Sequence, residues 1–151
     1  MLEAHPSALV VRTSACFGPG NDATYVARAL SALRARQAFL APNDVVASPT
    51  YLPDLVRAAL DLLVDGASGI WHLANEGAVT TLDLVRRIAS ECGVQTRGLL
   101  PCSCAALGLA ARRPAYSALG SERARLMPSL DDAIARYAHE QKQAWQAAGA
   151  A

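Results

Sequence analysis

The chain alternates short apolar runs with segments in which apolar residues recur at helical spacing. The run at residues 8–11 (ALVV) is closed by the polar residues 12–14, a pattern typical of a buried strand in a parallel sheet. A second such strand is predicted at 70–74, and it also runs into a polar turn. Two shorter apolar stubs, at 39–40 and 45–47, are bounded by loops that contain proline. These runs predict the strands of an α/β layer.

Two helices are predicted in the first half of the chain. The first spans residues 21–36, with Asn21 or Asp22 as its N-cap. The second has Pro53 in its first turn and ends at residues 66–69, where glycine recurs. We expect its core-facing side to consist of five apolar residues, namely Leu55, Val56, Ala59, Leu60 and Leu63.

Two more helices are predicted in the second half. Thr80, with Asp83 three residues later, resembles a capping box, and the helix that it starts runs to Gly93. The last helix runs from residue 129 to about residue 145, and the tail beyond it is expected to fray. Between them the pattern becomes irregular after residues 96–100, and this region holds one short helix. Because strands and helices alternate, the sequence favours an α/β domain with a mostly parallel sheet.

Size and charge narrow the possible functions. The chain has 151 residues, of which 52% are hydrophobic and 18% charged, with a formal net charge of +1. That length and apolar content suit one domain with a real core. The balanced charge offers no basic surface for nucleic acid, and no apolar run approaches the roughly 18 residues of a membrane span. With no signal-peptide pattern at the N-terminus, we expect a cytoplasmic protein.

The cysteines and histidines predict neither disulfides nor a metal site. The four cysteines are scattered, and Cys102 and Cys104 are too close for an unstrained disulfide, so we expect reduced thiols. His5, His72 and His139 lie far apart in the sequence and lack the paired spacing of zinc ligands.

Residues 18–23 (GPGNDA) match the pattern G-x-G-x-x-G/A of dinucleotide-binding turns. Six residues separate Val11 from Gly18, however, and Pro19 removes one of the amide donors that would hold a diphosphate. We therefore interpret the motif as a Gly/Pro loop before a capped helix. A small α/β binding module that uses this loop as its phosphate site is the alternative.

Catalytic motifs are missing from the chain. It has no G-x-S-x-G elbow and no Cys/His signature of a nucleophilic enzyme. Its only lysine is Lys142, and because position 138 is Ala, a Tyr-x-x-x-Lys pair cannot occur. Four aspartates are interpreted as solvated groups near helix ends or on a polar helix face, namely Asp54, Asp61, Asp65 and Asp83. We predict no catalytic residue in this chain.

Four ordered motifs carry a resemblance to a known family. They are ALVVRTS at 8–14, SPTY at 48–51 with Asp54 and Leu55 following, GIWHLAN at 69–75 and RPAYS at 113–117. In order and spacing they resemble the C-terminal half of the dTDP-4-dehydrorhamnose reductases, which are extended short-chain dehydrogenases/reductases. The resemblance covers nearly the whole chain, from about residue 8 to residue 137.

The resemblance implies the C-terminal part of a Rossmann-like fold, with parallel strands, helices and an irregular substrate-binding subdomain. It implies one substrate-binding domain over residues 1–151, with the NAD(P)-binding half, its glycine-rich turn and its Tyr-x-x-x-Lys pair outside this chain. An intact enzyme of this family reduces the C4 ketone of a dTDP-linked 4-keto-6-deoxysugar with NAD(P)H. The expected partners are this sugar nucleotide and the missing half, and the chain alone is expected to be catalytically incomplete and not to hold the cofactor tightly.

The resemblance also suggests substrate-binding residues, each with a structural alternative. Those expected to bind are Arg12, Thr13, Ser14, Ser48, Pro49, Thr50, Asn75, Arg113 and Tyr116. The Arg113 guanidinium suits a diphosphate, although a solvated surface arginine is the alternative. Thr13 and Ser14 could instead end a strand, Thr50 could cap the helix that contains Asp54, and Asn75 could form a turn. Tyr116 fits packing better than catalysis.

The chain departs from the family pattern at three places. Ala15 stands where the family usually has Trp, and Val45 and Ala47 replace an amide and a glycine near Asp44. These departures favour an alternative in which the domain is a non-catalytic binding or assembly module of a larger polypeptide. Because a partial parallel sheet leaves an edge strand and apolar faces uncovered, we also expect self-association.

Overall fold

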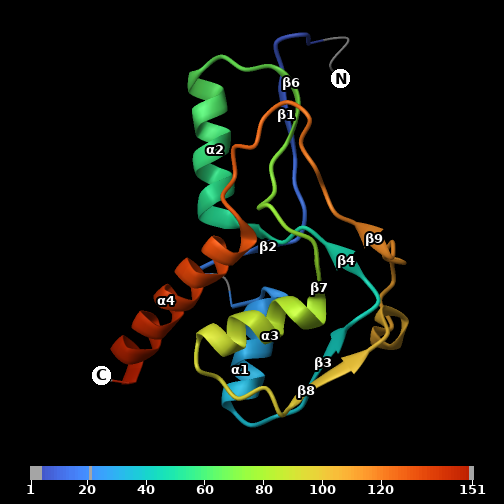
Figure 1. Cartoon of the computed structure of the whole chain (residues 1–151), viewed down its shortest axis with the longest axis vertical. Coiled ribbons are helices and arrows are strands. Elements are labelled where there is room, and N and C mark those ends of the chain that lie inside the picture. The colour runs from blue at the N-terminus through green and yellow to red at the C-terminus, as the bar shows by residue number, and fades with distance from the viewer. Residues whose placement is uncertain (1–4, 21, 150–151) are drawn as a thin grey trace.

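The computed structural model describes residues 5–20 and 22–149 as alternating strands and helices (Figure 1). The strands are β1 (Leu9–Arg12), β2 (Cys16–Phe17), β3 (Phe39–Pro42), β4 (Val46–Ala47), β5 (Thr50–Tyr51), β6 (Gly69–His72), β7 (Val79–Thr80), β8 (Leu99–Cys102) and β9 (Tyr116–Ser117). The helices are α1 (Tyr25–Arg34), α2 (Leu52–Val64), α3 (Thr81–Glu91), α4 (Leu130–Gly149) and the short 3₁₀ helix Cys104–Leu107. The predicted α/β alternation is confirmed.

The strands form four small sheets in which parallel pairing predominates. β1 pairs with β6, β2 with β5 and β3 with β8, all in parallel. β4 lies between β9, which is parallel to it, and β7, which is antiparallel. The mostly parallel pairing is therefore as predicted, but the strands do not join into one sheet. Residues 101 and 102, which lie where the pattern was expected to become irregular, belong to β8, the strand that pairs with β3.

Two hydrophobic clusters hold these elements together. In the larger one, α1, α3 and α4 pack around buried side chains such as Phe17, Tyr51 and Tyr137. In the smaller one, α2 covers one face of the β1–β6 pair, and Ala58 and Leu62 of the helix cluster with Leu73, which follows β6. Figure 1 shows this division, with α2 beside β1 and β6 at one end of the molecule and α1 and α3 at the other. The N-terminal ends of α2 and α4 meet where the two parts join.

The helix starts test the capping predictions. Helix α3 begins as predicted, because the Oγ1 atom of Thr80 accepts a hydrogen bond of 3.0 Å from the backbone N–H of Asp83. For α1 the prediction of Asp22 was wrong. The cap is Thr24, whose Oγ1 accepts from the N–H of Ala27 at 3.2 Å, so the Gly/Pro loop extends further before the helix begins. Asn21 lies outside the described residues.

The buried face of α2 differs from the predicted one. Ala58, Leu62 and Asp54 are buried, and Leu55 and Ala59 pack against the smaller cluster. The other three residues that were predicted to face the core are exposed: Val56 by 49%, Leu60 by 55% and Leu63 by 59%. The helix carries apolar residues around more than half of its circumference. The spacing of these residues in the sequence therefore could not predict which side of the helix packs on the narrow β1–β6 pair.

The last helix is longer than the sequence predicted. Ser129 precedes it, and α4 then continues past Trp145 to Gly149, so residues 146–149 of the tail that was expected to fray are helical. The last two residues of that tail lie outside the described part of the chain. The guanidinium of Arg34 stacks over the Trp145 ring, with its Cζ atom 4.0 Å from the ring centroid. This cation–π contact ties the end of α4 to α1. No helix among the described residues is long and apolar enough to span a bilayer.

Candidate functional site

The main candidate site is a cavity of about 710 Å³ beyond the carboxyl end of β1. Its walls come from the segment that follows β1, from α1 and α3, and from the stretch between β8 and β9. The carboxyl ends of parallel strands are where ligands bind in open α/β sheets, so this position is favourable for a site. Its volume lies within the range of small-molecule pockets.

Some of the predicted binding residues meet at this cavity. Thr13 and Ser14 line it where β1 ends, Pro49 lines it from the loop before β5, and Arg113 lines it from the segment before β9. Arg113 is exposed and makes no hydrogen bond or ion pair within the part of the chain that the structure describes. Its five N–H donors are therefore available to an anionic group.

The rest of the cavity wall is largely apolar and includes two free thiols. Leu107, Leu109 and Val79 contribute hydrophobic surface, and Cys16 and Cys104 contribute sulfur. Burial raises the pKa of the Cys16 thiol, although a hydrogen bond with Thr13 lowers it. The thiol therefore stays protonated near neutral pH and behaves as a small hydrophobic group.

Tyr25 forms part of the same wall in a fixed orientation. Its hydroxyl donates a hydrogen bond to the carbonyl oxygen of Leu40, and its ring packs edge-on against Phe39 with centroids 5.1 Å apart. Burial, together with the nearby thiols of Cys102 and Cys104, raises the pKa of Tyr25 to about 12. The phenol is therefore neutral at physiological pH, and its proton is already engaged.

Ser48 and Thr50 flank Pro49 but do not themselves line the cavity. The Ser48 hydroxyl accepts a hydrogen bond of 3.1 Å from the N–H of Leu119 and lies 3.4 Å from the carbonyl oxygen of the same residue. Thr50 donates from Oγ1 to the carbonyl oxygen of Ser48 at 3.2 Å. Both side chains are buried and fix the loop that presents Pro49. The alternative that Thr50 caps α2 was wrong, since Tyr51 occupies that position without a side-chain cap.

Asn75 belongs to a buried polar cluster outside this cavity. Its Oδ1 accepts from the N–H of Tyr51 at 2.7 Å, and its Nδ2 donates to Asp54 at 3.0 Å and to the carbonyl oxygen of Pro128 at 3.1 Å. Both amide hydrogens are thus engaged. Asn75 is 1% exposed and connects the chain segments around the start of α2, and it is not among the residues that line the main cavity.

Asp54 and Arg136 complete this cluster. Two guanidinium nitrogens of Arg136 donate to the two carboxylate oxygens of Asp54 at 2.7 Å each, and Asp132 accepts from the same guanidinium. Burial acts to raise the pKa of Asp54, but the hydrogen bonds from Arg136 and Asn75 outweigh it and lower the pKa below its usual value. The interpretation of Asp54 as a solvated helix-end carboxylate was wrong, because the group is buried and paired with Arg136. No local sequence pattern indicates this pairing, since the partner lies 82 residues away.

We call Tyr51, Asp54, Asn75, Arg136 and Glu140 the clamp. Tyr51 donates its hydroxyl proton to Glu140 at 2.6 Å, and Arg136 lies over the Tyr51 ring at 4.9 Å. The clamp therefore fastens α4 to the start of α2 and to the loop after β6. The sequence did not predict this assembly, because its members come from segments that only the tertiary fold brings together.

Arg12 and Tyr116 lie outside the main cavity. Arg12 is exposed at the end of β1, where it pairs in register with His72 of β6. Tyr116 is 69% exposed in β9, so the expectation that it packs in the fold was wrong. Neither side chain contributes to the wall that Thr13 and Arg113 form.

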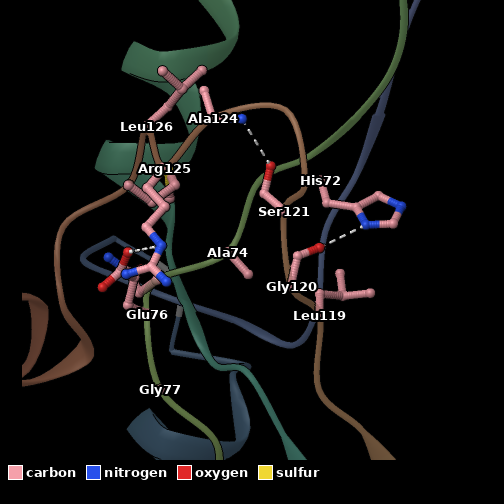
Figure 2. Close-up of a pocket in the computed structure, with 12 residues that line it drawn as sticks. His72, Ala74, Glu76, Gly77, Leu119, Gly120, Ser121, Ala124, Arg125 and Leu126 are labelled. Carbon is pink, nitrogen blue, oxygen red and sulfur yellow. Dashed lines mark hydrogen bonds and ion pairs between the residues drawn. The ribbon is translucent and has the colours of Figure 1, made fainter.

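A smaller cavity of about 290 Å³ lies at the carboxyl end of β6 (Figure 2). Figure 2 shows the His72 ring held by the carbonyl oxygen of Gly120, 2.9 Å from Nδ1, and the Arg125 guanidinium directed at Glu76, 3.3 Å away. These contacts join the segment before α4 to the sheet. His72, Glu76 and Arg125 thus have partners within the chain, and Asn75 of the clamp also lines this smaller cavity.

The glycine-rich loop does not form a dinucleotide cradle among the described residues. Gly18 is buried, and a Cβ atom there would come within 3.1 Å of the Leu52 Cβ, so this glycine allows the loop to contact α2. Pro19 offers no amide donor, and α1 begins only at Tyr25. The residues present therefore do not fit the diphosphate of a nicotinamide cofactor. Within the described ranges no three metal-ligating side chains come together.

The arrangement at the main cavity can bind and orient a ligand. Among the described residues that line it, it offers the guanidinium of Arg113, several hydroxyl groups that include those of Thr13 and Ser14, and an apolar wall, a composition that suits a molecule with both anionic and hydrophobic parts. Among the residues that line it, none pairs a nucleophile with a base.

Comparison with known proteins identifies the family to which the chain is similar. Residues 1–142 match the family model of the RmlD substrate binding domain. A dTDP-4-dehydrorhamnose reductase of Mycobacterium tuberculosis is 38% identical over 126 residues, which are 82% of this chain and 41% of the relative. A protein of the same name from Mycolicibacterium smegmatis is 34% identical over 145 residues, covering 89% of this chain and 44% of the relative. The chain thus spans less than half the length of these relatives.

Solved structures show the same fold. The dTDP-4-dehydrorhamnose reductase of Bacillus anthracis, crystallised in complex with NADP, superposes with a TM-score of 0.79 at 29% identity, over 87% of this chain and 48% of that one. The orthologue from Clostridium acetobutylicum superposes with a TM-score of 0.82 at 22% identity, over 91% and 50% of the two chains. The expected Rossmann-like half is confirmed as the fold of this chain.

Proposed function

The chain belongs to the RmlD substrate binding domain family, and from this premise we propose that it is the sugar-nucleotide-binding domain of a dTDP-4-dehydrorhamnose reductase-like enzyme. The ligand that we propose is a dTDP-linked deoxysugar, bound in the cavity beyond β1. In this proposal residues 1–151 act as one substrate-binding domain. The reaction served by the longer enzyme is reduction of the C4 ketone of a dTDP-4-keto-6-deoxysugar.

The observation that carries the proposal is the free guanidinium of Arg113 at a largely apolar cavity. An arginine that has no partner in the described part of the protein is suited to the diphosphate of a sugar nucleotide, because its fork can donate two parallel hydrogen bonds. Thr13 and Ser14 lie on the same wall and can donate to sugar oxygens. We assign supporting roles to Ser48, Thr50 and Asn75, which hold the surrounding loops.

Binding without turnover is the activity proposed for this chain alone. It contains no Tyr-x-x-x-Lys pair, and its Gly/Pro loop does not suit a cofactor diphosphate. NAD(P)H is proposed only as the cofactor of the longer enzyme, with support from the NADP bound to the Bacillus anthracis protein. The four free cysteines support a reducing compartment, and we propose the cytoplasm.

A non-catalytic sugar-nucleotide-binding or assembly module is the second candidate function. The observation that favours it is the wall beside Ser14, where Ala15, Val45 and Ala47 replace residues that the family usually carries. These small or aliphatic side chains leave less polar and aromatic contact for a sugar. A longer polypeptide whose other half lacks Tyr-x-x-x-Lys would support this second candidate.

Calorimetric titration tests the proposal. The chain should bind dTDP-rhamnose at one site and bind NADPH much more weakly. Arg113→Ala should weaken dTDP-rhamnose binding about tenfold or more, as expected for loss of a charge-assisted contact. Arg112→Ala is the matched control, since Arg112 is also exposed but does not line this cavity, and it should bind like the parent chain. Tight NADPH binding, or no binding of dTDP-rhamnose, would contradict the proposal.

A further inference from the structure

A surface arch carries part of the wall of the main cavity. The arch consists of residues 105–114, between β8 and β9, and it contributes Leu107, Leu109 and Arg113 to that wall. In Figure 1 it is the gold segment at the edge of the molecule away from α2 and α4. Among the described residues, the arch makes no hydrogen bond to any part of the chain outside residues 103–114. Its conformation therefore depends on how its two ends are held.

A side chain holds the first end of the arch. The backbone pairing of β3 with β8 extends to Asn43, whose N–H donates to the carbonyl oxygen of Cys102 at 3.1 Å. The next link is made by Asp44, whose Oδ1 atom accepts a hydrogen bond of 2.8 Å from the N–H of Cys104. Cys104 is the first residue of the 3₁₀ helix, so its N–H has no acceptor within that helix. The Asp44 carboxylate therefore supplies the acceptor that fastens the arch to the loop after β3.

Strand pairing holds the second end of the arch. The N–H of Val46 donates to the carbonyl oxygen of Ala115 at 2.9 Å, and β9 then continues in parallel with β4. Ser117 adds a hydrogen bond of 3.3 Å from its Oγ atom to the carbonyl oxygen of Val46. The backbone bond at this end does not depend on the identity of a side chain. The first end depends on a single carboxylate, so Asp44 is the residue whose loss should release the arch.

We propose that Asp44 is a positioning residue, which holds the arch so that Arg113 faces a ligand in the main cavity. Asp44 does not line that cavity, but together with Arg113 it lines a hollow of about 970 Å³ beneath the arch. A negative charge near the site repels a diphosphate, so the useful part of Asp44 is its acceptor oxygen. An arch that is fixed before binding lowers the entropy that a ligand loses by ordering it. This inference rests on the proposed function, because the ligand is the sugar nucleotide.

Hydrogen–deuterium exchange of the unliganded chain tests whether Asp44 holds the arch. Asp44→Ala removes the acceptor and should speed amide exchange in residues 104–114 several-fold. Asp44→Asn keeps a side-chain oxygen that can accept the same hydrogen bond, and it should exchange at the parent rate. Asp65→Ala is the matched control, because it removes the same charge from an exposed aspartate at the end of α2 and should leave the arch unchanged. Equal exchange in the parent chain and in Asp44→Ala would overturn the proposal.

Calorimetry with dTDP-rhamnose tests the effect on binding. Asp44→Ala should raise the dissociation constant about fivefold, whereas Asp44→Asn and Asp65→Ala should stay within about twofold of the parent chain. In the Arg113→Ala background, adding Asp44→Ala should weaken binding by less than about twofold, because no guanidinium is left to position. A residue that only supports the fold would weaken binding by the same factor in both backgrounds. Circular dichroism of each variant establishes that it is folded.

The outcomes separate this inference from the proposed function. A parent chain that does not bind dTDP-rhamnose would contradict the proposed function, and the binding role of Asp44 with it. A parent chain that binds, with unchanged affinity in Asp44→Ala, would overturn the role of Asp44 alone. Equal losses in Asp44→Ala and Asp44→Asn would show that the charge acts and not the acceptor oxygen, and equal losses with and without Arg113 would show that Asp44 does not act through the guanidinium. Either result would also overturn the proposal.

Discussion

The clamp and the main cavity use similar polar residues in opposite ways. In the clamp, Asp54, Asn75 and Arg136 are closely paired, with hydrogen bonds of 2.7 to 3.1 Å. At the cavity, Arg113 has no such partner among the described residues, and the surrounding wall is largely apolar. An arginine that is bonded within the chain stabilises the fold, whereas one left without a partner is available to a ligand.

This difference shows why residue type alone does not assign a role. Asn75 and Arg113 both belong to motifs that resemble the family's binding motifs. The structure surrounds Asn75 with backbone and carboxylate partners, and it leaves Arg113 at the mouth of a cavity. The comparison predicts that changes in the clamp reduce stability, while changes at the cavity reduce affinity.

The largest effect is expected for Asp54→Ala. It removes the carboxylate that Arg136 and Asn75 share. Breaking such a buried pair should lower the unfolding free energy by about 3 kcal/mol. This value is at the lower end of the range for buried ion pairs, because the Arg136 side chain is still 38% exposed. Urea unfolding followed by circular dichroism measures this loss. Asp61→Ala, an exposed aspartate on the same helix, is the control and should change stability by less than about 0.5 kcal/mol.

Acid should weaken the clamp selectively. The folded-state pKa of Asp54 is lowered, so the stability that its ionised form contributes is complete above the ordinary carboxyl pKa and is lost as the pH falls through the lower, folded value. The unfolding free energy should therefore drop as the pH falls below about 4. In Asp54→Asn this drop should be smaller. An equal drop in both proteins would show that other carboxylates control the acid sensitivity.

A smaller effect of the opposite sign, a gain in unfolding free energy, is expected for Tyr137→Phe. The Tyr137 side chain is completely buried between Phe17 and Tyr51, and its hydroxyl finds no hydrogen-bond partner among the described residues. Removing an unsatisfied buried hydroxyl should stabilise the fold by about 1 kcal/mol. Thermal unfolding detects the gain as a higher Tm. A lower Tm would mean that the hydroxyl has a polar partner in solution, such as a buried water.

The smallest effect is expected for Thr13→Val at the cavity. The substitution keeps the shape of the side chain and removes a hydroxyl, so dTDP-rhamnose binding should weaken only a few-fold, as expected for one neutral hydrogen bond of about 1 kcal/mol. Calorimetry on both proteins checks this, and the unfolding free energy should stay nearly the same. A large loss of stability with no change in affinity would assign Thr13 to the fold.

Local sequence patterns predicted most of the elements. The alternation of strands and helices, the Thr80 cap and the parallel pairing follow from neighbouring residues, whose preferences act over one or two turns. The same reasoning failed for the start of α1, where Thr24 competes with two other good capping residues. It also failed for α2, whose covered side depends on the width of the β1–β6 pair.

The candidate site was only partly predictable. Thr13, Ser14 and Arg113 follow from strand ends and from a motif, and the fold brings them to one cavity. The clamp could not be predicted, because Asp54 and Arg136 are joined across 82 residues and only the tertiary fold makes them neighbours. Asn75 was expected to bind substrate, and its three hydrogen bonds within the chain favour a structural role instead.

Hydrogen–deuterium exchange with and without dTDP-rhamnose tests most directly whether the free polar groups at the cavity are the ones that a ligand uses. The account predicts slower exchange in residues 13–17 and 104–117, which surround the cavity, and unchanged exchange in the clamp segments of α2 and α4. Protection confined to the clamp segments at saturating ligand, with the cavity segments unchanged, would contradict it.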